Sequence, residues 1–434
     1  MNSNLMVLAL NSGSSSLKAS VIKNNGSTTV VSFLAERLGT SDSIIHAVNY
    51  DDDDNKNKKE DLPKDDPLAS LTHGQALTCI IDYLRNKDLL NNVLAVGHRV
   101  VHGGTIFQDS AIIEEKELKQ IQSISHLAPL HNPHNVAGIE CMREILQGTP
   151  NVAIFDTSFH SSIPERAYTY PLPPEYRSRD MRKFGFHGTS VKYVSQKATE
   201  ILSTSSSLLV DGRKNYMKKN NGNGNDENLP IQMIVCHLGN GASVTAVSGD
   251  KSVETSMGFT PLSGLMMGTR CGDVDPSLVS FACHQLDKDV DEVLNDFNKR
   301  SGLKGMTHDG QNDMRELLSR AKTGDPEAVL AVDMFVYHLS QHIASFLVAL
   351  EGPVDAIIFT AGIGEHSSEI RKRTVEELSK ILPGLVLDPE RNEADGEKTD
   401  GVISKDGAWP IVLDIATDEE AMIAKECIRL VKQH

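Results

Sequence analysis

The feature that most constrains this chain is a strand, a tight turn and a second strand, a layout that occurs twice. Leu5–Leu10 is an apolar run that leads into Asn-Ser-Gly-Ser-Ser-Ser and then into the strand-like segment Leu17–Ile22. Met233–Cys236 leads in the same way into His-Leu-Gly-Asn-Gly-Ala and then into Ser243–Val247. Two similar units so far apart in one chain predict two related halves that face each other across a cleft.

Further apolar runs alternate with segments of helical periodicity, which predicts an α/β protein. The runs are Val93–Val96, Val152–Phe155, Ala356–Phe359 and Ile411–Leu413, and helical spacing relates Val191, Val194, Ala198 and Ile201. A chain of 434 residues is too long for one core, so we expect two domains. The predicted domains are residues 1–156 with 413–434, and residues 157–412. Residues 51–67 and 204–230 are polar insertions that we expect to be solvated loops.

Charge and cysteine content exclude several classes of protein. The formal net charge is −16, which is the wrong sign for binding nucleic acid or anionic lipid. The six cysteines form no CxxC pair, which favours reduced thiols over a zinc site or a disulfide framework. No secretory signal and no membrane span is recognisable, so we expect a cytoplasmic protein.

Three turns rich in small residues have the composition of phosphate-binding sites. Asn11–Lys18 places small residues in a hairpin turn and a lysine just beyond it, although it lacks the spacing of a Walker A loop. His237–Ala242 is its counterpart in the second half, and Thr360–Glu365 joins an apolar strand to a helix expected to begin near His366. The alternative is that these are ordinary turns whose glycines only supply positive φ.

Cations and acids cluster at the ends of the predicted strands. Arg99 and Arg270 lie in glycine-flanked segments, and Asp156 ends the strand Val152–Phe155. Acids at the carboxyl edge of a sheet often hold a cation or a metal ion. Thr417 and Glu420 fit a capping box, which leaves Glu419 free for Mg²⁺. His98 and His102 are four residues apart on a strand and are better explained as structural residues than as metal ligands.

Ten separated motifs, in one order, resemble those of acetate kinases. They are LNSGSSSLK (10–18), GHRVVHGG (97–104), APLHNP (128–133), FDTSFH (155–160), GFHGTS (185–190), CHLGNGASV (236–244), SMGFTPLSGLMMGTRCGD (256–273), NDMR (312–315), FTAGIGE (359–365) and TDEE (417–420). The resemblance implies a duplicated ribonuclease-H-like fold of the actin-like ATPase type. It also implies a homodimer, to which the apolar helix around Val332–Leu350 could contribute unless its apolar face is buried within the subunit.

The resemblance assigns roles to residues by their motifs. It implies transfer of the γ-phosphoryl group of ATP to acetate, giving ADP and acetyl phosphate, with Mg²⁺ or alternatively Mn²⁺. The metal ligands would be Asn11 and Glu419. The ATP site would comprise Lys18, Ser14, Ser16, His237, Leu238, Gly239, Asn240, Gly241, Asp313, Met314, Arg315, Gly362, Ile363, Gly364 and Glu365. The catalytic residues would be Arg99, Asp156, His187 and Arg270. Arg99 would also bind acetate. The methyl group of acetate needs a small apolar pocket, and the candidates, chosen because they lie beside the reactive motifs, are Val101, Leu130, Phe186 and Pro261, although each could instead belong to the core.

Simple chemistry restricts the mechanism and leaves the substrates partly open. A carboxylic acid titrates near ~4, so acetate is already ionised and needs no general base. Asp156 is therefore expected to orient Arg99 or a magnesium-bound water. Propionate or butyrate remains an alternative acceptor. Pyrophosphate remains an alternative donor, because residues 307–311 depart from the usual pattern of the family beside the adenine site. His366 and Ala416 also depart from the family motifs, and we expect no chemical consequence from Ala416. A non-catalytic nucleotide-binding regulator is disfavoured, since it would not need Arg99, His187, Arg270 and Glu419 together.

Overall fold

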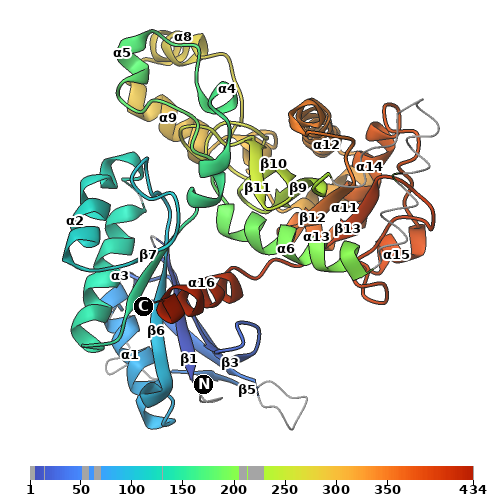
Figure 1. Cartoon of the computed structure of the whole chain (residues 1–434). Coiled ribbons are helices and arrows are strands. Elements are labelled where there is room, and N and C mark those ends of the chain that lie inside the picture. The colour runs from blue at the N-terminus through green and yellow to red at the C-terminus, as the bar shows by residue number, and fades with distance from the viewer. Residues whose placement is uncertain are drawn as a thin grey trace. The chain divides into compact units, whose positions relative to one another are not determined.

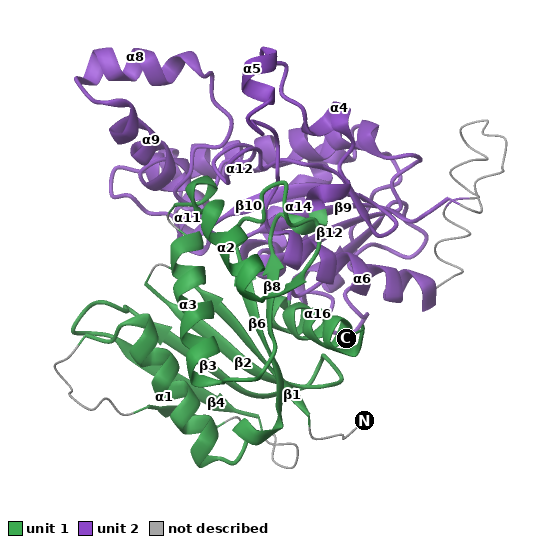
Figure 2. Ribbon diagram, turned by 60° about the vertical axis from the view of Figure 1, so that its left-hand side comes forward, with its two compact units in different colours: residues 1–159, 418–434 green, residues 160–417 purple. Residues whose placement is uncertain are grey.

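The computed structural model describes residues 5–13, 15–50, 58–62, 70–129, 131–204, 213 and 229–433 (Figure 1). The chain divides into two compact units (Figure 2). Unit 1 contains residues 1–159 and 418–434, and unit 2 contains residues 160–417. Within the described residues, no helix is both long and apolar enough to cross a membrane.

The described part of unit 1 is built on one sheet with the strand order β5-β4-β3-β2-β1-β6-β8-β7. The strands are β1 (Met6–Ser12), β2 (Leu17–Lys23), β3 (Thr29–Glu36), β4 (Ile44–Asn49), β5 (Lys58–Asp61), β6 (Val93–Val100), β7 (Ala111–Ile112) and β8 (Asn151–Phe155). The pairs from β1 to β5 are antiparallel, whereas β1, β6 and β8 run parallel to one another. The carboxyl ends of these three parallel strands therefore meet at one edge of the sheet.

Helices cover both faces of this sheet, because successive residues of a strand point to opposite sides. Leu8 and Leu10 of β1 belong to a core shared with α1 (His73–Asn86) and α3 (Asn132–Ile145). Val7 and Ala9 belong to a second core, shared with α16 (Glu419–Gln433). The remaining helix is α2 (Glu115–Ser123), with short 3-10 turns at Leu90–Asn92, Ser125–Leu127 and Ser158–Ser162.

One expectation about the insertions was wrong in part. Residues 58–61, inside the segment expected to be a loop, form β5, which pairs antiparallel with β4. All four residues of β5 are exposed, so the strand lacks the apolar pattern from which it could have been predicted. Backbone hydrogen bonds to β4 hold it at the edge of the sheet. The neighbouring residues 51–57 and 63–67 lie outside the described residues, as does most of 204–230.

The described part of unit 2 repeats the central arrangement of unit 1. Its strand order is β11-β10-β9-β12-β13. The strands are β9 (Gln232–Leu238), β10 (Ala242–Ser248), β11 (Lys251–Thr255), β12 (Ala356–Thr360) and β13 (Ile411–Asp414). An antiparallel hairpin, β9 with β10, is followed by two parallel neighbours, β12 and β13, as β1 with β2 is followed by β6 and β8. The predicted α/β class and its internal duplication are confirmed.

Helices surround the second sheet, and one of them, the short helix α13, was not predicted. The helices are α4 (Glu165–Tyr168), α5 (Pro174–Arg177), α6 (Gly188–Thr204), α8 (Ser277–Leu286), α9 (Val290–Lys299), α10 (Gly302–Gly305), α11 (Met314–Lys322), α12 (Pro326–Phe346), α13 (Ala361–His366), α14 (Ser368–Leu378) and α15 (Pro389–Glu393). The glycine segment after β12 is itself the short helix α13, and α14 begins at Ser368. In α12 the predicted apolar face, including Val332 and Leu339, is buried within the subunit.

Candidate active site

The parallel strands of unit 1 bring three predicted residues to one edge of the sheet. Asn11 lies in β1, Arg99 lies in β6, and Asp156 directly follows β8. Arg99 Nε and Nη2 donate to the Asp156 carboxylate over 2.9 Å and 2.6 Å, and Nη1 donates to Asn11 Oδ1 over 3.1 Å. Asp156 is almost fully buried. The guanidinium is therefore held in a fixed orientation by a carboxylate and an amide.

Glu419, the first residue of α16, completes this group. Its Oε2 lies 3.7 Å from Arg99 Nε. Burial alone would lower the pKa of Arg99, but Asp156 and Glu419 outweigh that effect and raise the pKa above its ordinary value. The predicted capping box is wrong, because Asp418 Oδ1 accepts the hydrogen bond from Ala421 N over 2.8 Å. The Thr417 hydroxyl bonds instead to Ser190 over 2.7 Å.

The predicted phosphate turn of unit 1 is a tight hairpin between β1 and β2. Gly13 N donates to Ser16 O over 2.8 Å and closes the turn. Lys18 is exposed and stands opposite Asn11 in the register of the two strands, so both side chains project from the same face of the sheet. Ser14 lies outside the described residues.

Two buried asparagines of α3 support this edge, and sequence reasoning missed them. Asn135 accepts from Val101 N over 3.2 Å and donates to Ser12 O over 3.0 Å. Asn132 exchanges two hydrogen bonds with the backbone of His102. The asparagines thus fix the segment after β6 and the last residue of β1 to the same helix. Their only signal in the sequence was the polar HNPHN run at the start of a helix.

The apolar candidates for an acetate site lie in different surroundings. Val101, just beyond β6, is half-buried. In unit 2, Phe186 is buried and Pro261 is half-buried. Leu130 lies outside the described residues. Val101 and Pro261 therefore have accessible surface that could contact a small ligand, and Phe186 has little.

Two stacked histidines mark the predicted site of unit 2. The rings of His187 and His237 have centroids 4.1 Å apart and are tilted by 27°. His187 Nδ1 lies 3.0 Å from Ser243 Oγ, and His237 Nδ1 lies 2.8 Å from Ser190 Oγ. Each histidine is thereby held through Nδ1, which fixes its ring orientation. His187 has φ of +61°, an uncommon conformation for a residue with a side chain.

Arg270 and His187 meet at the glycine turn between β9 and β10. A Cβ atom added to Gly241 would lie 3.1 Å from Arg270 Nη1 and 3.2 Å from His187 Nε2, so the absence of a side chain admits both groups. Similarly, a Cβ on Gly268 would lie 2.1 Å from Asn240 Oδ1. Burial lowers the pKa of Arg270, and no carboxylate among the described residues pairs with its half-buried guanidinium. Such a group is suited to receive an anion.

The glycine helix α13 adjoins the same turn. A Cβ on Gly239 would lie 3.8 Å from Ala361 Cβ, whereas a Cβ on Gly362 would meet nothing within 4 Å. Open space therefore lies beside Gly362. The Glu365 carboxylate accepts from Ala361 N over 2.7 Å and from Thr417 N over 3.0 Å. The Glu365 side chain therefore stabilises the backbone of α13. This structural role accounts for the side chain without a direct contact to nucleotide.

The predicted adenine-flanking residues begin α11. Asp313 caps the helix by accepting from Arg315 N over 2.9 Å, and it also pairs with the Arg315 side chain. That pairing lowers the pKa of Asp313 to about 2. The Met314 side chain is buried in the core. Leu238 is also buried, and Ile363 is half-buried. Because the side chains of Met314 and Leu238 are buried, these residues could contact a ligand only through their backbone atoms.

The donor set at the edge of unit 1 is chemically suited to Mg²⁺. This ion prefers oxygen ligands and usually binds one or two protein groups together with waters and substrate phosphates. Asn11 and Glu419 supply an amide oxygen and a carboxylate, and both lie next to Arg99. No group of three or more His, Cys, Asp or Glu residues within the described ranges could form an all-protein cage. The residues therefore fit a metal ion that is shared with phosphate.

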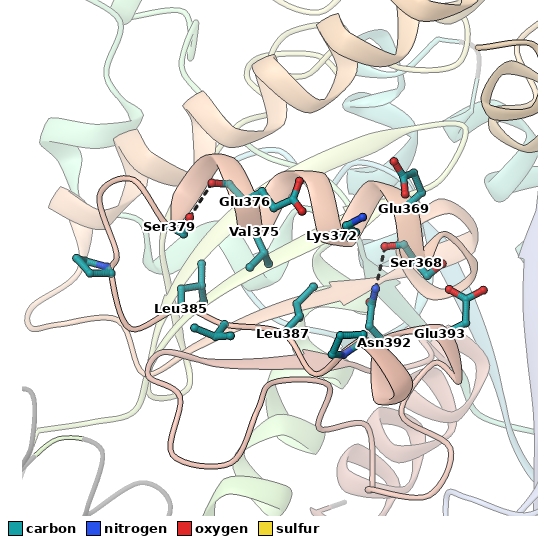
Figure 3. Close-up of a pocket in the computed structure, with 13 residues that line it drawn as sticks. Ser368, Glu369, Lys372, Val375, Glu376, Ser379, Leu385, Leu387, Asn392 and Glu393 are labelled. Carbon is teal, nitrogen blue, oxygen red and sulfur yellow. Dashed lines mark hydrogen bonds between the residues drawn. The ribbon is translucent and has the colours of Figure 1, made fainter. Parts of the chain in front are cut away.

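A cavity of about 750 Å³ lies in unit 2 between α14 and α15 (Figure 3). Leu385 and Leu387 form part of its apolar lining, and Glu369, Lys372 and Glu393 carry charge around it. None of the predicted site residues lines it. Asn392 donates to Ser368 O over 2.9 Å across one end of the cavity.

Comparison with known proteins identifies the family. The sequence model of the acetokinase family matches residues 6–210 and 213–425. The chain belongs to the acetokinase family. An acetate kinase of Staphylococcus haemolyticus is 41% identical over 432 residues, which is 98% of each chain. An acetate kinase of Bacillus subtilis is 40% identical over 431 residues, covering 98% of this chain and 99% of the relative.

Solved structures of family members have the same fold. A propionate kinase from Francisella tularensis has a TM-score of 0.83 at 35% identity and covers 97% of this chain and 98% of its own. The acetate kinase of Porphyromonas gingivalis has a TM-score of 0.82 at 32% identity and covers 98% of this chain and 99% of its own. The family and fold predicted from the motifs are thus confirmed.

Proposed function

We propose that this acetokinase family member is an acetate kinase, which reversibly transfers the γ-phosphoryl group of ATP to acetate. The observation that carries the proposal is Arg270, a half-buried cation with no carboxylate partner among the described residues. It lies beside His187 and a glycine turn, which is the environment that a transferring phosphoryl group needs. The named relatives support acetate as the acceptor.

The reaction requires no proton transfer. A carboxylate oxygen of acetate forms a bond to the γ-phosphorus, while the bond from that phosphorus to the β–γ bridging oxygen breaks. The electron pair of the broken bond leaves with ADP. Because acetate is ionised at neutral pH, no residue has to act as a base. We therefore assign Asp156 to the orientation of Arg99, from which it accepts three hydrogen bonds.

The main obstacle is repulsion between an anionic acceptor and an anionic phosphate. In unit 2, Arg270 and His187 would stabilise the charge on the equatorial phosphoryl oxygens, with Ser243 holding the imidazole. In unit 1, Arg99 would hold the carboxylate of the acceptor. An arginine that stabilises a phosphoryl transition state contributes about 10³-fold or more in rate.

The remaining predicted residues would bind the nucleotide and the metal. The turns at Gly239–Gly241 and Gly362–Gly364 would contact phosphates through their backbones, as would Ser16 with the nearby Lys18. Asn11 and Glu419 would hold Mg²⁺, which when bound neutralises phosphate charge. Residues 313–315 would border the adenine and ribose.

A panel of donors and acceptors tests the proposal. The purified chain is supplied with MgCl₂ and hydroxylamine, and ATP, GTP or pyrophosphate is combined with acetate, propionate or butyrate. Trapping of acyl phosphate as the hydroxamate gives kcat/KM for each pair. We expect ATP with acetate to be best, since one methylene changes specificity by roughly 10- to 200-fold. Preference for propionate would reassign the acceptor, and absence of any acyl phosphate would contradict catalysis.

The homodimer and the cytoplasmic location remain predictions. The apolar face of α12 that includes Val332 and Leu339 packs inside the subunit, which favours the alternative interpretation of that face. Exposed apolar side chains include Leu330 and Tyr337 of α12, and Leu278 and Phe281 of α8. Light scattering coupled to gel filtration would measure the molar mass and decide between one copy and two.

A further inference from the structure

Arg371 of α14 is a charged residue that the proposed mechanism does not use, although it is completely buried. Burying a guanidinium requires that its charge and its N–H groups be satisfied by protein. Its contacts show which part of the molecule it supports. Two of them fall on the glycine helix α13, and the others fix the guanidinium to neighbouring elements.

Arg371 holds the carbonyl end of α13. Its Nη1 donates to Gly364 O over 2.8 Å and to Glu365 O over 2.7 Å. A helix of six residues has little stability of its own, and its last carbonyls lack partners within the helix. A cation at this end donates hydrogen bonds to these carbonyls and interacts favourably with the negative end of the helix dipole.

The other end of α13 is strained, which explains why it needs support. Ala361 has φ of +63°, a conformation that is unfavourable for a residue with a Cβ atom. The Glu365 side chain folds back and accepts from Ala361 N. The turn is therefore held at its first residue by the Glu365 side chain and at its last carbonyls by Arg371.

Arg371 is itself fixed by groups from other elements. Its Nε donates to Asn392 Oδ1 over 2.8 Å, next to the cavity of Figure 3. Nη2 pairs with Asp395, and Nη1 lies 2.8 Å from Asp414 Oδ2 at the end of β13. The guanidinium thus joins α13 to β13 and to the α15 region at a fixed distance. A single ammonium group could not make these contacts together.

We propose that Arg371 is a positioning residue, which keeps the Gly362–Gly364 backbone in the conformation that binds nucleotide phosphates. The inference rests on the proposed function of that turn. Its consequence is selective, because the acetate-binding residues do not depend on α13. Loss of the Arg371 guanidinium should weaken nucleotide binding and leave KM for acetate unchanged.

The test compares Arg371→Lys with Arg373→Lys. Arg373 lies on the same helix and pairs with Asp333 of α12, so its substitution controls for a change of arginine to lysine in α14. We expect Arg371→Lys to raise KM for ATP at least tenfold and to change KM for acetate less than twofold. The control should leave both constants unchanged. Equal rises in both constants, or no rise for ATP, would overturn the proposal.

Two further measurements keep the test decisive. If Arg371→Lys does not fold, Asn392→Ala removes one anchor of the guanidinium and keeps the charge, and KM for ATP should rise two- to fivefold. Unchanged ATP affinity in a folded Asn392→Ala variant would count against the role.

Titration of each protein with a fluorescent ADP analogue measures nucleotide affinity without turnover. A wild type that binds the analogue but makes no acyl phosphate would contradict the proposed function and still allow Arg371 to be tested.

Discussion

Arg99 and Arg270 carry the same charge in opposite surroundings. Arg99 is held by Asp156, Asn11 and Glu419, so its position is set before any ligand arrives. Arg270 has only the Met267 sulfur as a side-chain partner within the described ranges, at 3.8 Å. The first arrangement suits orientation of a substrate, and the second suits charge that develops during the reaction. Sequence motifs predicted both arginines but could not distinguish their surroundings.

Replacing Arg270 by lysine tests whether geometry or charge matters. We expect Arg270→Lys to lower kcat by about 10³-fold, because an ammonium group cannot present two parallel N–H donors. Steady-state kinetics of hydroxamate formation measures the effect. Arg300→Lys is the matched control, since Arg300 pairs with Asp296 at the surface and should tolerate the change. A kcat for Arg270→Lys close to that of wild type would refute the role.

Val101 tests the proposed acetate site. We expect Val101→Ala to shift relative kcat/KM towards propionate or butyrate, because removal of two methyl groups makes room for a longer acyl chain. The adjacent Val100 points into the core, so Val100→Ala should lower stability and leave the preference among acids unchanged. An identical chain-length profile in Val101→Ala and wild type would exclude this residue from the pocket.

At the scale of elements, hydrophobic patterns in the sequence predicted the strands, but they did not predict the polar side chains that hold the strand ends in place. The apolar runs before Asn11, Asp156 and Gly239 became β1, β8 and β9, because hydrophobic periodicity is a local property. Buried polar partners such as Asn135 and Ser243 are chosen by tertiary neighbours that no local pattern specifies. For the same reason the motif alone did not reveal that Glu365 closes its own turn.

The contact of β6 with α16 offers a test at this scale. A Cβ on Gly97 would lie 2.3 Å from Ile423 Cγ2 and 2.6 Å from Cys427 Sγ, so the helix could not pack as closely. We expect Gly97→Ala to reduce the free energy of unfolding by about 1–3 kcal/mol, measured by urea denaturation. Gly74→Ala in α1 is the control. A Cβ there meets nothing within 4 Å, and alanine should stabilise the helix by up to ~1 kcal/mol.

At the scale of the whole molecule, two buried histidines should make stability depend on pH. Burial lowers the pKa of His98 and of His102 from 6.5 to about 4. Between these values the unfolded chain binds protons that the folded chain does not. The free energy of unfolding should therefore fall as the pH drops from 6.5 to 4, by at most roughly 1.4 kcal/mol per pH unit for each histidine.

Urea denaturation at several pH values measures this dependence. His98→Gln should reduce the slope between pH 6.5 and 4, whereas His284→Gln, at an exposed position of α8, should not. Equal slopes for wild type and His98→Gln would show that His98 does not titrate as described. The bond from His98 Nε2 to Asn151 Oδ1 supports the structural role predicted for this histidine.

The packing of α16 on the sheet of unit 1 also has a consequence for folding during translation. Ile423, Ala424 and Cys427 cover the face of the first sheet that carries Val7 and Ala9. These last residues are translated only after all of unit 2 has been made. During synthesis, one face of the earliest sheet therefore stays uncovered for most of translation and becomes a natural target for chaperones that bind exposed apolar surface.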